Sequence, residues 1–181
     1  PVFCTVGSVK QARAAIAAGA DGLIAQGVEA GGHLAGTERL DTLLPAVVET
    51  AADLPVLAAG GVADADDVRR LLAAGAVAAV SGTRFLLTEE SPAHPEYKRR
   101  VMGADRTLRT ELFGLGWPMP HRVVPNAATE RWCGRNETGP ALVRAANRLG
   151  APLGRAVPLA RLAELAAAQR IRVPLFSPAL P

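Results

Sequence analysis

GLIAQGVEAGGH, at residues 22–33, runs from a short apolar stretch directly into a glycine-rich loop. The same arrangement recurs over residues 1–90: an apolar run, a turn, an Ala-rich stretch that glycine closes, and the next apolar run. The apolar runs expected to form strands are Pro1–Thr5, Gly22–Gln26, Pro55–Ala59 and Val77–Ser81. These runs show little polar alternation, which is typical of parallel strands covered by helices. The predicted fold class is therefore α/β.

Helical spacing fills the segments between these runs. The expected helices are Ser8–Ala18 with Ser8 as cap, Leu40–Ala52, and Ala65–Ala74 with Asp64 as cap. Four such units fit either a small doubly wound sheet or half of a (β/α)8 barrel, which needs about 250 residues in full. Beyond residue 90 the alternation ends. We expect a helix over His94–Met102, extended segments over Arg106–Glu111 and Arg122–Val124, and a last helix over Pro158–Arg170.

Composition excludes several classes of protein. With 49% hydrophobic and 20% charged residues, the 181-residue chain is predicted to be globular rather than disordered. Its apolar stretches fall well short of the roughly 20 residues of a membrane-spanning helix, so no membrane partner is expected. The two cysteines, Cys4 and Cys133, make no disulfide framework, and no secretory signal opens the sequence. We therefore expect a reducing, cytoplasmic setting.

Charge is unevenly distributed. Residues 1–98 carry 7 basic and 12 acidic side chains, whereas residues 99–181 carry 13 and 5. The basic part is Arg-rich but has neither Lys clusters nor interleaved aromatic residues. We interpret it as a solvated or interdomain surface, and no nucleic-acid partner is predicted.

Three glycine-bearing loops directly follow predicted strands. They are the loop Gly27–Thr37, which carries His33, the turn Gly60-Gly61 and the turn Ser81-Gly82-Thr83. In (β/α)8 barrels a ligand phosphate commonly rests between the loops after strands seven and eight. If the two turns are those loops, the chain holds strands 5 to 8, the C-terminal half of a TIM-type barrel. It then divides into a half-barrel with a phosphate site at residues 1–105 and a mostly helical C-terminal extension at 106–181 that packs on the barrel.

A specific resemblance rests on three segments. AQGVEAGGH, LPVLAAGGVADADDV and VAAVSGTRFLLTEES occur in this order. Together they resemble the nitronate monooxygenase family, formerly called 2-nitropropane dioxygenases, which are FMN-dependent (β/α)8-barrel flavoproteins. The resemblance extends over residues 1 to about 126, more loosely toward its end.

The resemblance implies an enzyme with FMN as cofactor. His33 would be the catalytic histidine, and Gln26 and Gly31 would contact the cofactor. The cofactor phosphate would be held by Gly60, Gly61, Ser81, Gly82 and Thr83. The reaction would oxidise an alkyl nitronate, such as propionate 3-nitronate, with O2 to a carbonyl compound and nitrite. No metal is implied.

Other polar residues have simpler interpretations. Glu29 is expected to shape its loop, and His94 and His121 are expected at the surface. Asp64, Asp66 and Asp67 are interpreted as helix-start charges rather than a metal site, because no His or Cys lies near them in sequence. His33 itself could be an ordinary loop residue within a glycine-rich turn.

Two alternatives to the monooxygenase remain open. One is a flavin-dependent enoyl-acyl-carrier-protein reductase, a family that shares the EAGGH and AAGG motifs, or the related NAD(P)H:quinone reductase activity. Alternatively, the chain is a truncated, non-catalytic fragment, because half a barrel exposes two strand edges and an open core face. In either case the missing barrel half or a homo-oligomer is expected to cover those edges.

Overall fold

The computed structural model describes residues 1–113, 119–134, 137–156 and 158. The chain divides into two compact units, a first unit Pro1–Phe85 and a second unit Leu86–Pro181. The sequence had suggested a boundary at residue 105. The division after Phe85 assigns the helix that begins at Pro95 to the second unit.

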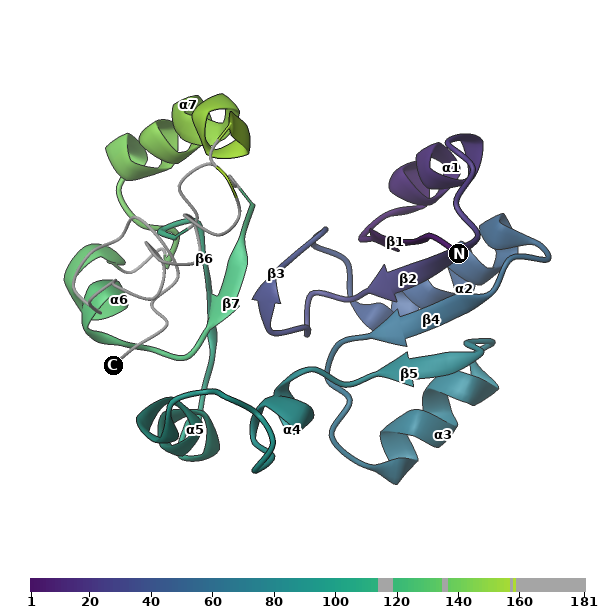
Figure 1. Cartoon of the computed structure of the whole chain (residues 1–181), viewed down its shortest axis with the longest axis horizontal. Helices are drawn as coiled ribbons and strands as arrows, with labels where there is room; N and C mark the ends of the chain where they lie inside the picture. The colour runs from purple at the N-terminus through teal and green to yellow at the C-terminus, as the bar shows by residue number, and fades with distance from the viewer. Residues whose placement is uncertain (114–118, 135–136, 157, 159–181) are drawn as a thin grey trace. The chain divides into compact units, whose positions relative to one another are not determined.

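A parallel sheet forms the first unit. Its strands are β1 (Phe3–Val6), β2 (Gly22–Gln26), β4 (Val56–Ala59) and β5 (Ala78–Val80), adjacent in that order (Figure 1). The connecting helices are α1 (Val9–Ala17), α2 (Leu40–Ala51) and α3 (Ala65–Ala73). The two-residue strand β3 (Gly32–His33) lies between β2 and α2, and the short helix α4 (Thr83–Leu86) follows β5. The predicted α/β class with a parallel sheet is confirmed.

The spatial order of these four strands follows their order in the chain. Each strand pairs in parallel with the one before it, from Phe3 opposite Gly22 to Ala59 opposite Val80. A doubly wound sheet reverses its order at a switch point, whereas consecutive barrel strands do not. The order therefore favours the barrel over the doubly wound alternative, and membership of a barrel stays a prediction.

The core of the first unit lies between the sheet and α2. Alternate strand residues such as Leu23 and Ala58 are fully buried, because successive side chains of a strand point to opposite faces. Leu43 and Val47, one helical turn apart on α2, are also fully buried in the same cluster. This packing fixes α2 against β2 and β4, and hence fixes the point at which the loop after β2 must rejoin the helix.

The second unit contains two short strands and three helices among the described residues. They are α5 (Pro95–Met102), β6 (Leu108–Thr110), β7 (His121–Val123), α6 (Ala127–Trp132) and α7 (Ala141–Ala156). Strands β6 and β7 are antiparallel, and a small core forms around Leu112, Phe113 and Ala128. The helix expected over Pro158–Arg170 lies outside the described residues except for Pro158.

The two tail histidines differ in environment. His94 is exposed, as predicted, and its Nδ1 accepts a hydrogen bond from the backbone N–H of Glu96 at the start of α5. His121 is fully buried, so its predicted place at the surface is wrong. It pairs with the equally buried Thr110 in the β6–β7 ladder, a pairing that the adjacent prolines had obscured.

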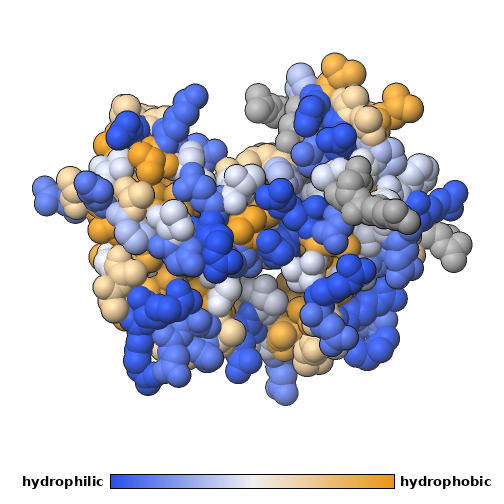
Figure 2. Space-filling model, turned by 180° about the vertical axis from the view of Figure 1, so that it is seen from behind, coloured by the Kyte–Doolittle hydropathy of each residue, from blue (hydrophilic) through white to orange (hydrophobic). Residues whose placement is uncertain are grey.

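On the face of the molecule shown in Figure 2, hydrophilic and hydrophobic residues are interspersed. Among the described residues, no helix combines the length and the apolar character needed to cross a bilayer.

Candidate functional site

Three connections leave the same edge of the parallel sheet. They are residues 27–39 after β2, hereafter the His33 loop, residues 60–64 after β4, and residues 81–82 after β5. Because β2, β4 and β5 are parallel neighbours, their carboxyl ends lie together, where sites form in α/β proteins. The backbone N–H of Gly27 donates to the carbonyl of Ala59 at 2.9 Å, and the Ser81 hydroxyl donates to the carbonyl of Val62 at 2.9 Å. These bonds tie the three connections to one another.

Glycine is required where the connections approach most closely. Gly60 has φ +127°, and a Cβ there would lie 3.1 Å from the backbone nitrogen of Ala30. Gly61 follows with φ +65°. A Cβ on Gly31 would lie 3.1 Å from the Thr83 hydroxyl oxygen. Side chains are costly at the positive φ values of Gly60 and Gly61, so these two positions leave main chain, not side chains, at the meeting point.

The structure thus brings together most of the residues predicted from the sequence to hold a cofactor. Gly31, Gly60, Gly61, Ser81 and Thr83 share one edge of the sheet through the contacts above. Gly82 lies between Ser81 and Thr83, and no heavy atom lies within 4 Å of the position that a Cβ would take there. The site therefore has a glycine-lined part next to open space.

Gln26, the last residue of β2, spans part of the His33 loop. Its Nε2 donates to the carbonyl of His33 at 3.0 Å, and its Oε1 accepts from the backbone N–H of Ala35 at 2.7 Å. The carboxamide therefore holds the backbone on both sides of Leu34. A contact between Gln26 and FMN stays a prediction, for which the carboxamide retains one N–H and one lone pair.

His33 is exposed at the end of β3. Partial desolvation lowers the pKa of its imidazole below the ordinary value of 6.5. At neutral pH the ring is therefore mainly uncharged, and an uncharged imidazole can accept a proton or donate a hydrogen bond.

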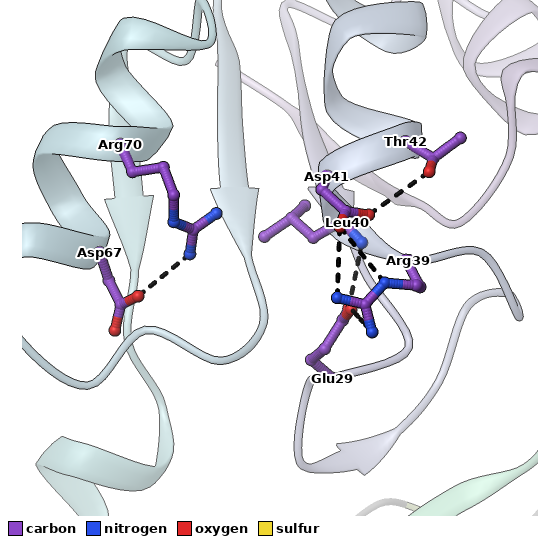
Figure 3. Close-up of polar contacts among 7 residues, drawn as sticks. All are labelled: Glu29, Arg39, Leu40, Asp41, Thr42, Asp67 and Arg70. Atoms are coloured by element: carbon purple, nitrogen blue, oxygen red, sulfur yellow. Dashed lines mark hydrogen bonds and ion pairs between the residues drawn. The ribbon is translucent and has the colours of Figure 1, made fainter.

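Glu29 joins the His33 loop to α2. Its Oε2 accepts from the backbone N–H of Leu40 at 3.1 Å, and its Oε1 lies 3.5 Å from Nη1 of Arg39 (Figure 3). The residue before α2, Arg39, makes no side-chain cap of its own. A carboxylate from the loop thus satisfies a free amide at the positive end of the helix. The predicted structural role of Glu29 is confirmed.

The next helix is capped locally. Asp64 Oδ1 accepts from the backbone N–H groups of Asp66 and Asp67 at 2.9 and 3.0 Å. This confirms the interpretation of the acidic group as charges at a helix start. Figure 3 also shows Asp67 paired with Arg70 on the same helix, at 3.0 Å.

Gln11 was missed by the sequence analysis. This residue of α1 accepts from the backbone N–H of Gly7 at 2.7 Å through Oε1, and its Nε2 donates to the carbonyl of Ala35 at 3.0 Å. The adjacent backbones of Gly7 and Gly36 are in contact, since a Cβ on Gly36 would lie 2.1 Å from the Gly7 carbonyl oxygen. No local pattern indicates a contact between residues 24 positions apart. The glycines at 7 and 36 were the only signal.

Comparison with known proteins gives a consistent result. The family model described as nitronate monooxygenase matches residues 2–172. A protein named nitronate monooxygenase from Neurospora crassa is 44% identical over 127 residues, covering 66% of this chain and 32% of that protein. A carboxyl-CoA dehydrogenase from Mycobacterium tuberculosis, named for a methyl-oxo-octahydroindene carboxyl-CoA, is 40% identical over 135 residues, covering 72% and 37%.

Two solved structures are also similar. The nitroalkane oxidase of Streptomyces ansochromogenes has a TM-score of 0.67 and 34% identity, over 84% of this chain and 47% of that one. FabK of Thermotoga maritima has a TM-score of 0.64 and 36% identity, over 72% of this chain and 41% of that one. The chain spans about a third of the length of the curated relatives it matches.

Proposed function

The chain belongs to the nitronate monooxygenase family, and from that premise we propose that it forms the cofactor-binding part of an FMN-dependent nitronate monooxygenase. The reaction is oxidation of an alkyl nitronate, such as propionate 3-nitronate, with O2 to a carbonyl compound and nitrite. One observation carries the proposal: the glycine turns after β4 and β5 meet the His33 loop at one edge of the sheet. Strands β1, β2, β4 and β5 are then barrel strands 5 to 8, and the remaining strands belong to another part of the protein or to a second copy.

The residues at this edge fit the phosphate of FMN. Gly60 and Gly61 have backbone angles that few other residues adopt, and successive main-chain N–H groups in such turns bind anions. The Thr83 hydroxyl, close to Gly31, adds a hydrogen-bond donor. At Gly82 no heavy atom lies within 4 Å of the position that a Cβ would take, which leaves room for a phosphate to approach the main chain. Ser81 supports the turn through its bond to Val62.

The cofactor, when bound, supplies the electron transfer between nitronate and O2. This chain supplies binding, orientation and proton handling. Its His33 imidazole, whose pKa lies below 6.5, accepts a proton from the carbon acid of a neutral nitroalkane or donates a hydrogen bond to a nitronate oxygen. Either role places the ring nitrogen within about 3 Å of the substrate. Gln26 and Glu29 hold the main chain that carries it.

A second candidate follows from one relative. The carboxyl-CoA dehydrogenase of M. tuberculosis is named for a CoA thioester and is 40% identical. The same site would then serve an oxidoreductase acting on a thioester, in the manner of an enoyl-acyl-carrier-protein reductase. An NAD(P)H:quinone reductase is a related alternative.

Turnover by the full-length protein carrying this chain distinguishes these functions. Nitrite release with O2 uptake on propionate 3-nitronate supports the monooxygenase, whereas NADH oxidation that depends on crotonyl thioester or quinone supports the alternatives. His33→Asn should keep the flavin and lower nitronate turnover by about a hundredfold, within the usual range for a general base. Unchanged turnover would remove the catalytic assignment of His33.

Cofactor placement has its own test. Gly82→Ala adds a methyl group in open space, so the free energy of unfolding should stay within about 0.5 kcal/mol of the parent while flavin retention falls. Thr83→Val, which removes only the hydroxyl, should weaken retention less. Flavin absorbance per protein measures both. Full retention in both variants would place the phosphate elsewhere.

A further inference from the structure

Two glutamines from different elements bind the backbone of one residue of the His33 loop, Ala35. Gln26, at the end of β2, accepts from the backbone N–H of Ala35, and Gln11, on α1, donates to the carbonyl of Ala35. Gln26 also donates to the carbonyl of His33. The backbone from His33 to Ala35 is therefore held by three side-chain hydrogen bonds of 2.7–3.0 Å.

The same segment is supported from the end of β1. Gln11 accepts from the N–H of Gly7, and the Gly7 and Gly36 backbones are in contact, with no room for a Cβ on either. At its other end the loop closes through Val28, whose N–H donates to the carbonyl of Glu38 at 2.8 Å. The loop is thus attached to β1, β2 and α1 by groups that are not part of it.

We propose that Gln11 is a positioning residue for His33, acting through the main chain of Ala35, which Gln26 also binds. Its two hydrogen bonds join the main chain near the imidazole to Gly7, directly after β1, and so fix it relative to β1 and α1. This inference rests on the proposed function for the role of His33, but the arrangement of the loop itself does not depend on it. Gln11 lies outside the predicted cofactor contacts, so its effect on His33 is separable from flavin binding.

Matched variants separate the contributions of the two hydrogen bonds that Gln11 makes. Gln11→Glu keeps an acceptor for the N–H of Gly7 but places an oxygen against the carbonyl of Ala35. Gln11→Leu removes both bonds at similar volume. Arg13→Gln is the control, since Arg13 is exposed on the same helix.

Histidine NMR reads the position of His33 without any cofactor. The chain has three histidines, and His94, on α5 of the second unit, serves as the internal reference. The His33 imidazole signal, assigned by its loss in His33→Asn, should shift and titrate at a changed pKa in both Gln11 variants, while the His94 signal stays. Hydrogen exchange at the Gly7 amide, whose N–H donates to Gln11, should accelerate on the order of fivefold in Gln11→Leu, as expected for loss of one hydrogen bond. Arg13→Gln should change none of these.

In the full-length protein both Gln11 variants should retain flavin and lower kcat about tenfold with little change in KM, because misplacement of a reacting group costs rate. An unchanged His33 signal and titration in both variants would overturn the positioning role, whatever happens to kcat. Shifted His33 signals in a protein that lacks nitronate turnover would instead uphold the positioning and overturn the proposed function.

Discussion

The connection from β2 to α2 and the connection from β4 to α3 both contribute to the candidate site, and they are built in different ways. The first is long, carries His33, and is held by side chains of Gln11, Gln26 and Glu29. The second is a short turn of glycines, and the helix after it is capped by its own Asp64. A loop that presents a side chain needs its backbone fixed from outside, whereas a turn that presents main chain needs only the conformational freedom of glycine.

A substitution at the contact between Gly7 and Gly36 should destabilise the connection from β2 to α2 more than any other substitution considered. A Cβ on Gly36 would lie 2.1 Å from the Gly7 carbonyl oxygen, which cannot move without displacing β1. We expect Gly36→Ala to lower the free energy of unfolding by about 3 kcal/mol, the upper range for overpacking. Gly32→Ala is the control. Gly32 also has a positive φ, +76°, but no heavy atom lies within 4 Å of the position that its Cβ would take, so this substitution should cost only about 1 kcal/mol. Urea unfolding measures both, and equal losses would show that the contact is not tight.

Gly60 is the corresponding position in the second connection. Gly60→Ala should cost about 2 kcal/mol in free energy of unfolding, because φ +127° strains any residue with a Cβ. The expected loss is smaller than for Gly36→Ala, since the nearest atom lies 3.1 Å away rather than 2.1 Å. Thermal unfolding of the two variants side by side tests the order, and a reversed order would contradict it.

The carboxylates at the starts of α2 and α3, Glu29 and Asp64, test whether the two connections are independent. Glu29→Ala and Asp64→Ala should each lower the free energy of unfolding by about 1 kcal/mol, the usual cost of a lost cap. Only Glu29→Ala should also speed hydrogen exchange within the His33 loop, since Glu29 connects this loop to the N–H of Leu40. Faster loop exchange in Asp64→Ala would mean that the two connections are not independent.

Titration of His33 gives the smallest expected effect. Desolvation lowers the pKa of His33 in the folded chain below its value in the unfolded chain, so the unfolded state binds more protons between these two values. Stability should therefore rise with pH up to about 6.5 and fall as the pH drops through the folded pKa. In His33→Asn this part of the pH dependence should disappear, as urea unfolding from pH 5 to 8 would measure. An unchanged profile would assign the dependence to other groups.

Most of the first unit could be predicted from its sequence. The short apolar run after Gly19 predicted β2 at its observed bounds, and Ser8 and Asp64 marked the starts of α1 and α3. The glycines at 31, 60 and 61 pointed to the meeting of the connections because glycine signals backbone conformation directly. Apolar runs, helix caps and glycine positions are local properties, which can be read directly from a sequence.

Contacts between distant residues could not be predicted in the same way. The bond from Gln11 to Ala35 and the burial of His121 opposite Thr110 depend on how elements pack, and neither leaves a spacing that a single sequence displays. Gln26 shows the same limit, since the resemblance suggested a cofactor contact but gave no indication that both ends of its carboxamide bind the loop.

The main chain of Ala35, whose N–H and carbonyl each bind a glutamine, also constrains how this loop can vary. Both bonds use the main chain of Ala35, so its methyl group takes part in neither. A library randomised over codons 34–37 and selected for folding should accept many side chains at 35 while retaining glycine at 36. Engineers who wish to reshape the surroundings of the imidazole would therefore find their freedom at position 35.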